Sequence, residues 1–188
     1  MTDEQRLILK MAAVLLDYPA RPVFKESLSE WVAWTKELDE RLDTLVLAMR
    51  EIDPRMLAKL YVATFDFDAK RSLYMTAHEL GDSRDRGQAL IELTQLYRKF
   101  GCEVPNDQLP DFLPLLLEWV AIFPLASPPS LLERISRVCR LIAERLEPEH
   151  LYRPLFDIVV DALGVAASEF PMMVEEHPDL VDLPYPIQ

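Results

Sequence analysis

The chain has 188 residues, half of them hydrophobic, so it is long enough to bury one substantial core and is most simply a single domain. Its four glycines are too few for the tight turns of an all-β fold or a nucleotide-binding α/β fold. The formal net charge of −12, without an evident basic face, excludes a nucleic-acid-binding protein.

Helical apolar spacing, interrupted by proline and aspartate, predicts several helices before residue 65. Thr2 and Gln5 have the spacing of a capping box, and the apolar period that follows them ends at Pro19. The segment 38–49 is also amphipathic and is either a separate helix or a continuation of the helix before it. The helices of this part are expected to begin at Thr2, Pro22 and Asp53, with Pro54 in the first helical position of the last.

After Phe65 the apolar period breaks and resumes in shorter units. A short helix through Tyr74 and His78 is expected to end at Gly81, where a residue with positive φ fits. If Asp111 is the N-cap of a later helix, Pro114 falls at its third position, where a missing amide costs little. The later helices are expected to begin at Asp82, at Asp111 if it is the N-cap, at Ser127 with Pro128 and Pro129, and at Pro148. No strand is required, so the expected fold is an all-α, single-domain helical bundle.

The last residues, 168–188, have a different composition. They contain five acids, four prolines and neither Lys nor Arg, so they account for −5 of the net charge of −12. Proline at this density precludes a long helix, which leaves a flexible solvated tail or an extended strap along the surface. We expect the flexible tail, and therefore a helical domain over 1–167 followed by an acidic, proline-rich tail over 168–188.

No segment of the sequence predicts export or membrane insertion. The N-terminus is acidic and lacks a cleavable apolar stretch, and nowhere do about eighteen apolar residues run together. Cys102 and Cys139 have neither CxxC spacing nor the density of a disulfide scaffold, so each is expected to be reduced and buried. These features favour a soluble protein in a reducing compartment.

The sequence lacks the motifs of an enzyme or a metal site. His78 and Glu79 begin like the zinc motif HExxH, but the second histidine is missing. His150 and His177 have no Cys or carboxylate at ligand spacing, and no phosphate-binding or nucleophile motif occurs. We therefore expect no catalytic residues, no metal and no bound cofactor.

Asp111 and Glu118 are seven residues apart, with Leu115 between them on the same face of the expected helix. Two helical turns separate the carboxylates by about 10.5 Å, so they cannot share a proton, and this separation argues against a hydrolase that uses them. They are placed to hold two cationic side chains of a helical peptide. The alternative is an N-cap followed by a solvated helix acid. The net charge likewise favours a basic partner, although carboxylates that serve solubility alone explain it equally well.

Aromatic residues alternate with Asp66 and Asp68 in the segment that follows. Helical aromatic spacing usually indicates core packing, but buried carboxylates are costly unless paired, so this segment is expected at the rim of a binding site. A solvated turn of mixed charge is the alternative. The aromatic residues are Tyr61, Phe65, Phe67 and Tyr74, and the cations available for pairing are Lys70, Arg71, Arg84 and Arg86.

Together these motifs resemble the redox-enzyme maturation chaperones of the TorD/DmsD/NarJ superfamily, and within it the NarJ branch of nitrate reductase assembly chaperones. The similarity covers about Met1 to Gly164. Members of the wider superfamily often have His after the Pro-Asp pair, where this chain has Phe112, so no role of that His is carried over. The similar strings are YVATFDFDAKRSLY (61–74), HELGDSRDRG (78–87), LTQLYRKFG (93–101) and LPDFLPLLLEW (109–119).

The resemblance implies a TorD-like, all-helical chaperone in the cytoplasm that binds the N-terminal segment and the apo form of the nitrate reductase catalytic subunit. It implies support of molybdenum cofactor and iron–sulfur cluster insertion before membrane docking, without turnover. A structural helical adaptor for another redox enzyme is the alternative. The expected peptide-binding residues are Tyr61, Phe65, Asp66, Asp68, Tyr74, His78, Asp111, Leu115, Glu118 and Trp119, with Asp66, Asp111 and Glu118 at the edge of the groove.

Overall fold

The computed structural model describes residues 1–20, 22–33 and 35–165, and within these ranges it contains ten α-helices, one 3₁₀ turn and no β-strand. The all-α prediction is confirmed. The predicted tail, 168–188, lies outside the described residues. The elements are α1 (Asp3–Leu15), α2 (Pro22–Trp31), α3 (Thr35–Leu38), α4 (Glu40–Glu51), α5 (Pro54–Phe65), η1 (Ala69–Arg71), α6 (Met75–Leu80), α7 (Asp85–Lys99), α8 (Leu113–Ile122), α9 (Pro129–Glu144) and α10 (Arg153–Leu163).

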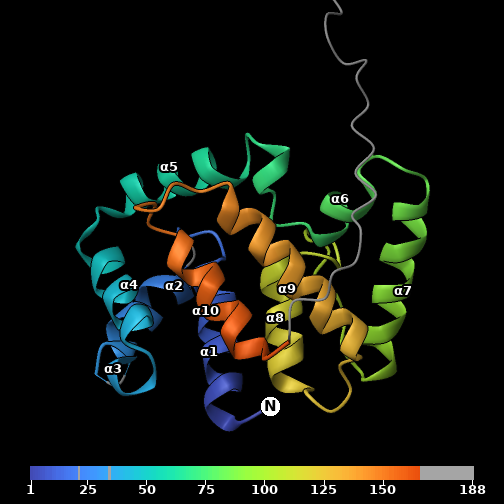
Figure 1. Ribbon diagram of the computed structural model, residues 1–188, viewed down its shortest axis with the longest axis horizontal. Helices are drawn as coiled ribbons and strands as arrows, with labels where there is room; N and C mark the ends of the chain where they lie inside the picture. The colour runs from blue at the N-terminus through green and yellow to red at the C-terminus, as the bar shows by residue number, and fades with distance from the viewer. Residues whose placement is uncertain (21, 34, 166–188) are drawn as a thin grey trace, which may run out of the picture.

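The core forms where α1 packs against α8 and α10, with α9 against α10 on the outside. Figure 1 shows α5 across one end of these helices and α7 at the outer edge. Helix α8 is apolar around most of its circumference, and Leu113, Leu116 and Leu117 have no exposed surface. Burial of one such side chain contributes about 1.5–3 kcal/mol, so the pairing of α8 with α1 anchors the fold.

Local capping signals position several helices as predicted. The Thr2 side chain accepts a hydrogen bond from the Gln5 amide at 3.1 Å, and the Gln5 side chain accepts one from the Thr2 amide at 2.7 Å. Asp53 caps α5, with Pro54 in its first turn. Gly81 ends α6 at a φ of 52°, where a side chain would be strained. Asp39 caps α4, so the segment 38–49 is a helix separate from α2.

Three predicted helix starts are wrong: Asp82, Asp111 and Pro148 lie in the turns that precede their helices, whereas α9 opens at Pro129 as predicted. Proline is also common in turns, so Pro148 alone did not fix the start of α10. Ser127 does not cap a helix; its hydroxyl donates to the Phe123 carbonyl at 2.9 Å. The observed starts are Asp85 rather than Asp82, Leu113 rather than Asp111, and Arg153 rather than Pro148.

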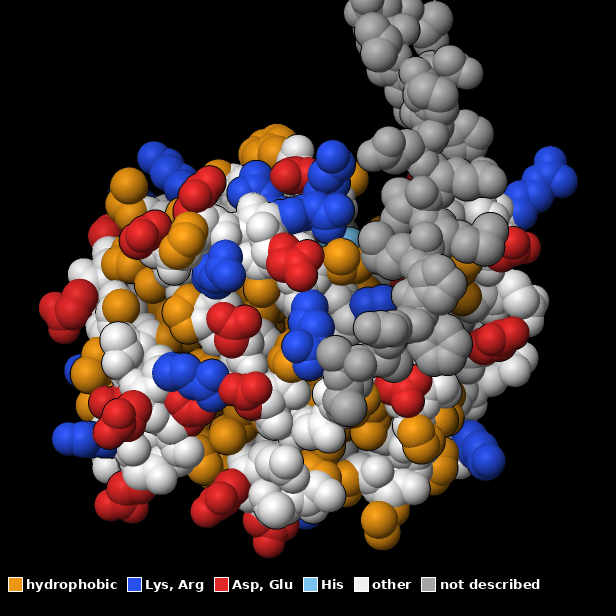
Figure 2. Space-filling model, viewed as in Figure 1, with side chains coloured by type: hydrophobic (Ala, Val, Ile, Leu, Met, Phe, Trp, Pro, Cys, Tyr) orange, Lys and Arg blue, Asp and Glu red, His pale blue; other side chains and the backbone are white. Residues whose placement is uncertain are grey.

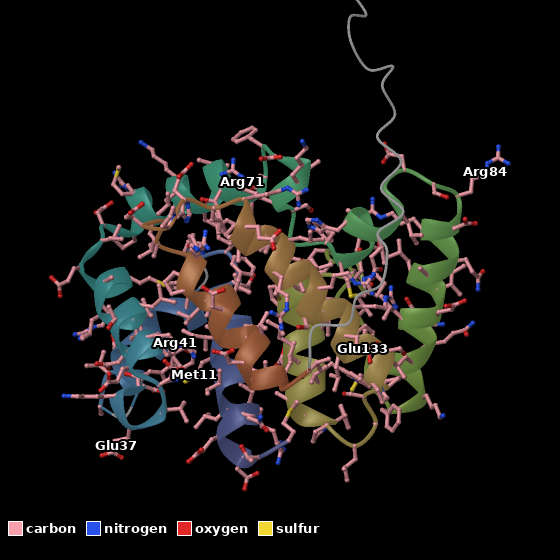
Figure 3. All side chains as sticks on the ribbon, viewed as in Figure 1. Met11, Glu37, Arg41, Arg71, Arg84 and Glu133 are labelled. Carbon is pink, nitrogen blue, oxygen red and sulfur yellow. The ribbon has the colours of Figure 1, made fainter. Side chains whose placement is uncertain are left out.

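Charged side chains are spread over the surface. On the face shown in Figure 2, acidic and basic side chains are interspersed. Arg41 pairs with Asp161 at 2.7 Å and thereby links α4 to α10 (Figure 3). Such exposed pairs contribute little to stability. None of the helices in the described ranges is both long and apolar enough to cross a lipid bilayer.

Candidate functional site

An open groove lies between α2, the C-terminal end of α4 and one face of α5. Its volume of about 1170 Å³ exceeds the roughly 300–1,000 Å³ that is usual for a small-molecule site, so it fits a peptide segment. Its wall is largely apolar and includes Tyr18, Phe24, Leu28, Met49, Leu57, Ala58, Val62 and Phe67.

Phe67 is the most accessible aromatic residue of this groove. Its side chain is 83% exposed although it lies directly after α5. An exposed large apolar side chain at the mouth of an apolar groove is available for a partner to cover. The charged side chains of the groove are cationic in the described part of the chain: Arg50, Arg55 and Lys59. The groove therefore lacks the acidic edge that the sequence predicts.

The side of α5 that packs on the core carries Tyr61 and Phe65, which are buried. Phe65 is 4% exposed, and its ring meets the rings of Tyr152 at 5.0 Å and Phe156 at 6.1 Å edge to face. The Tyr61 hydroxyl donates to the Leu16 carbonyl at 3.1 Å, and burial raises its pKa. These two residues hold α5 against α10 and do not line the groove. For them the alternative of core packing is correct.

Asp111 is fully buried, so the prediction that it lies at a groove edge is wrong. Its Oδ2 atom accepts hydrogen bonds from the Thr76 amide at 3.1 Å and the Thr76 hydroxyl at 2.5 Å. The Arg86 guanidinium lies 3.9 Å from the same oxygen and donates to the Thr76 hydroxyl at 3.1 Å. Asp111 therefore caps α6, from a position 35 residues away in sequence, instead of its own helix.

The backbone around Asp111 strengthens this connection between α6 and α8. The Met75 amide donates to the Asp111 carbonyl at 3.0 Å, and the Leu113 amide donates to the Leu73 carbonyl at 2.8 Å. Arg134 of α9 binds both carboxylate oxygens of Glu79, at 2.8 and 2.7 Å. Helix α6 is thus held by polar contacts from α7, from α9 and from Asp111 in the turn before α8.

Trp119 and Leu115 lie on α8, away from the aromatic cluster of α5. Trp119 is buried, and its ring meets the rings of Tyr97 at 5.7 Å and Phe100 at 5.9 Å between α7 and α8. Leu115 is half-buried against the core and Glu118 is exposed. Because Asp111 precedes the helix and is buried, Asp111 and Glu118 do not form the pair of surface carboxylates that the sequence predicts.

Three other predicted residues lie in the segment between α5 and α6. Asp68 caps η1 and pairs with Arg71 at 3.0 Å, as expected for a turn of mixed charge, whereas Asp66 is exposed. Tyr74 is half-buried against Phe112, and burial raises its pKa. Figure 3 shows Arg84 projecting away from the body at the start of α7, so it does not pair with Asp66 or Asp68.

His78 has a structural partner instead of a metal. Its Nε2 atom lies 2.7 Å from the Ser72 carbonyl, so this nitrogen carries the proton and donates. Burial lowers the pKa of His78 below its usual value, which favours the neutral ring. Within the described ranges, no group of three or more His, Cys, Asp or Glu side chains is placed to hold a metal ion.

The structure thus does not bring the ten predicted residues together in one site. Tyr61 and Phe65 lie between α5 and α10, Trp119 lies between α7 and α8, and the residues around Asp111 join α6 to α8. Asp66 lies next to the groove residue Phe67 in sequence. Sequence reasoning missed the groove itself. The signal for it was the pair of small residues, Ala58 and Ala63, that α5 contributes to the groove wall.

The chain combines an all-helical fold with an apolar groove of peptide size, and a solved structure has the same fold. A solved structure from Archaeoglobus fulgidus, described as a redox enzyme maturation protein, matches with a TM-score of 0.63 at 18% identity, over 85% of this chain and 94% of that one. The chain belongs to the nitrate reductase delta subunit family, whose pattern it matches over residues 23–147.

Relatives of this chain have assigned roles. It is 32% identical over 165 residues to the nitrate reductase molybdenum cofactor assembly chaperone NarJ of Escherichia coli K12, covering 84% of this chain and 70% of that protein. It is 30% identical over 168 residues to a protein of Bacillus subtilis named as a probable NarJ, covering 86% and 91%. These relatives are assembly chaperones and not enzymes, in agreement with the prediction.

Proposed function

We propose that this chain binds the N-terminal segment of the nitrate reductase catalytic subunit in the cytoplasm. It holds the apo subunit while molybdenum cofactor and iron–sulfur clusters are inserted, and releases it for membrane docking. Membership of the family supports the nitrate reductase client, and the groove between α2 and α5 supports the binding of a peptide. Binding and release suffice for this function, so no catalytic group is needed.

The apolar wall of the groove is the observation that carries this proposal. An amphipathic helix often binds by laying its apolar face into a groove between two helices of its partner. Here α2 and α5 flank such a groove. The Phe67 side chain is 83% exposed and is accessible to such a helix. Among the residues that the sequence predicts as peptide contacts, Asp66 remains in the proposed site, because it is exposed and adjoins Phe67.

The substitution Phe67→Ala tests this assignment. We expect it to weaken binding of a synthetic N-terminal peptide of the catalytic subunit by about tenfold or more, since a buried Phe contributes about 1.5–3 kcal/mol. The measurement is titration calorimetry. Leu125→Ala is the matched control, because Leu125 is fully exposed in the turn between α8 and α9 and does not line the groove.

Both variants are expected to keep the helical circular dichroism of the parent chain, because exposed apolar side chains contribute little to folding stability. Unchanged affinity in Phe67→Ala would remove the groove from the proposed site. A parent chain that does not bind the peptide at all would contradict the proposed client segment.

A further inference from the structure

The charge of the groove is opposite to that of the chain. The net charge is −12, yet the charged side chains that line the groove in the described ranges are Arg50, Arg55 and Lys59. All three are exposed, and none of them forms an ion pair with another described side chain. The groove therefore suits an apolar segment that carries carboxylates.

This chain itself contains a segment of that chemistry. Residues 176–188 have three acids, three prolines and no Lys or Arg. Proline favours an extended conformation that loses little entropy when it binds an apolar groove. The acids are Glu176, Asp179 and Asp182, and the large apolar residues between and after them are Leu180, Val181, Leu183, Tyr185 and Ile187.

The chain is long enough to bring this segment to the groove. A Cβ atom on Gly164 would lie 3.5 Å from the Gln5 side chain, and Figure 1 shows α10 ending beside the start of α1. The 13 residues of α1 span about 20 Å and lead to Tyr18 in the groove wall. Residues 166–175, if extended, span about 33 Å, which is sufficient.

We propose that residues 176–188 bind in the groove between α2 and α5 of the same molecule and compete there with the client segment. The docking of residues 176–188 does not depend on the identity of the client. Only the competition rests on the proposed function. A weakly held occupant of matching charge shields the apolar wall until a client that binds more tightly displaces it, which keeps free chaperone from capturing other apolar segments.

Photo-cross-linking in the full chain tests the docking. Benzoylphenylalanine replaces Tyr185, the protein is irradiated without client, and the linked peptides are identified by mass spectrometry. We expect intramolecular links to α2 or to residues 54–67. The double variant Arg55→Glu, Lys59→Glu should lower their yield about fivefold, because two exposed charge pairs become repulsive. Adding Asp179→Lys and Asp182→Lys to that variant should restore the yield.

Three results would overturn the docking: links that map elsewhere on the molecule, links that join two molecules, or a yield that the charge reversals leave unchanged. The N-terminal peptide of the catalytic subunit is then added to the parent chain. Loss of the groove links supports the competition, whereas links that persist while calorimetry shows peptide binding overturn it. Absence of peptide binding contradicts the proposed function and leaves the docking intact.

Discussion

Replacing Phe65 with alanine is expected to lower the free energy of unfolding by about 3–5 kcal/mol, the usual cost of truncating a buried aromatic residue. Phe65 is 4% exposed and meets the rings of Tyr61, Tyr152 and Phe156. The substitution would leave a cavity where α5 packs on α10, so it is expected to lower the stability of the fold. Urea unfolding followed by circular dichroism measures it.

Phe67→Ala is the matched control, because Phe67 lies two residues further along and is exposed. The two variants are expected to behave in opposite ways. Phe65→Ala lowers stability and leaves the peptide affinity of the folded protein unchanged, whereas Phe67→Ala lowers affinity alone. If Phe65→Ala unfolds like the parent and binds the peptide weakly, Phe65 lines the site, as the sequence predicts.

Replacing Asp111 with alanine is expected to cost about 3 kcal/mol of stability, because two hydrogen bonds to a buried carboxylate are lost. The Thr76 amide and hydroxyl would lose their acceptor, and Arg86 would lose its counter-charge. The effect is measured by urea unfolding. Glu118→Ala, an exposed carboxylate on α8, is the control and should change stability by less than about 0.5 kcal/mol.

Asp111→Asn adds a second comparison. The amide oxygen of Asn can still accept from Thr76, so this variant should lose less stability than Asp111→Ala. Both variants should bind the client peptide as the parent does when they are folded, since Asp111 has no exposed surface. A stable Asp111→Ala variant with weakened peptide binding would indicate that Asp111 belongs to the binding site, as the sequence predicts.

The parts of the fold that the sequence predicts are those with local causes. The capping box of Thr2 and Gln5, the cap at Asp53 and the positive φ of Gly81 each depend on a few neighbouring residues. Asp111 shows where this reasoning fails. An aspartate before an apolar run looks the same whether it caps that helix or another, and here its partner is Thr76, 35 residues away.

The candidate site depended on such distant pairings. Tyr61 and Phe65 were predicted as peptide contacts from the resemblance and from their acidic neighbours, but Tyr152 and Phe156, at the start of α10, cover them. The groove is formed by other residues of α5 together with α2 and the end of α4. Which face of an amphipathic helix meets the core is decided by the helices that pack on it, and α10 is nearly 90 residues away in sequence.

The proposal that this chain is an assembly chaperone is tested most directly by the state of the client that it retains. The full chain, carrying an affinity tag, is purified from cells that make its nitrate reductase with and without molybdenum cofactor synthesis. We expect it to retain the cofactor-free catalytic subunit and to release the mature one. Equal retention of both forms would indicate a structural adaptor, and failure to retain the catalytic subunit in either state would contradict the proposal.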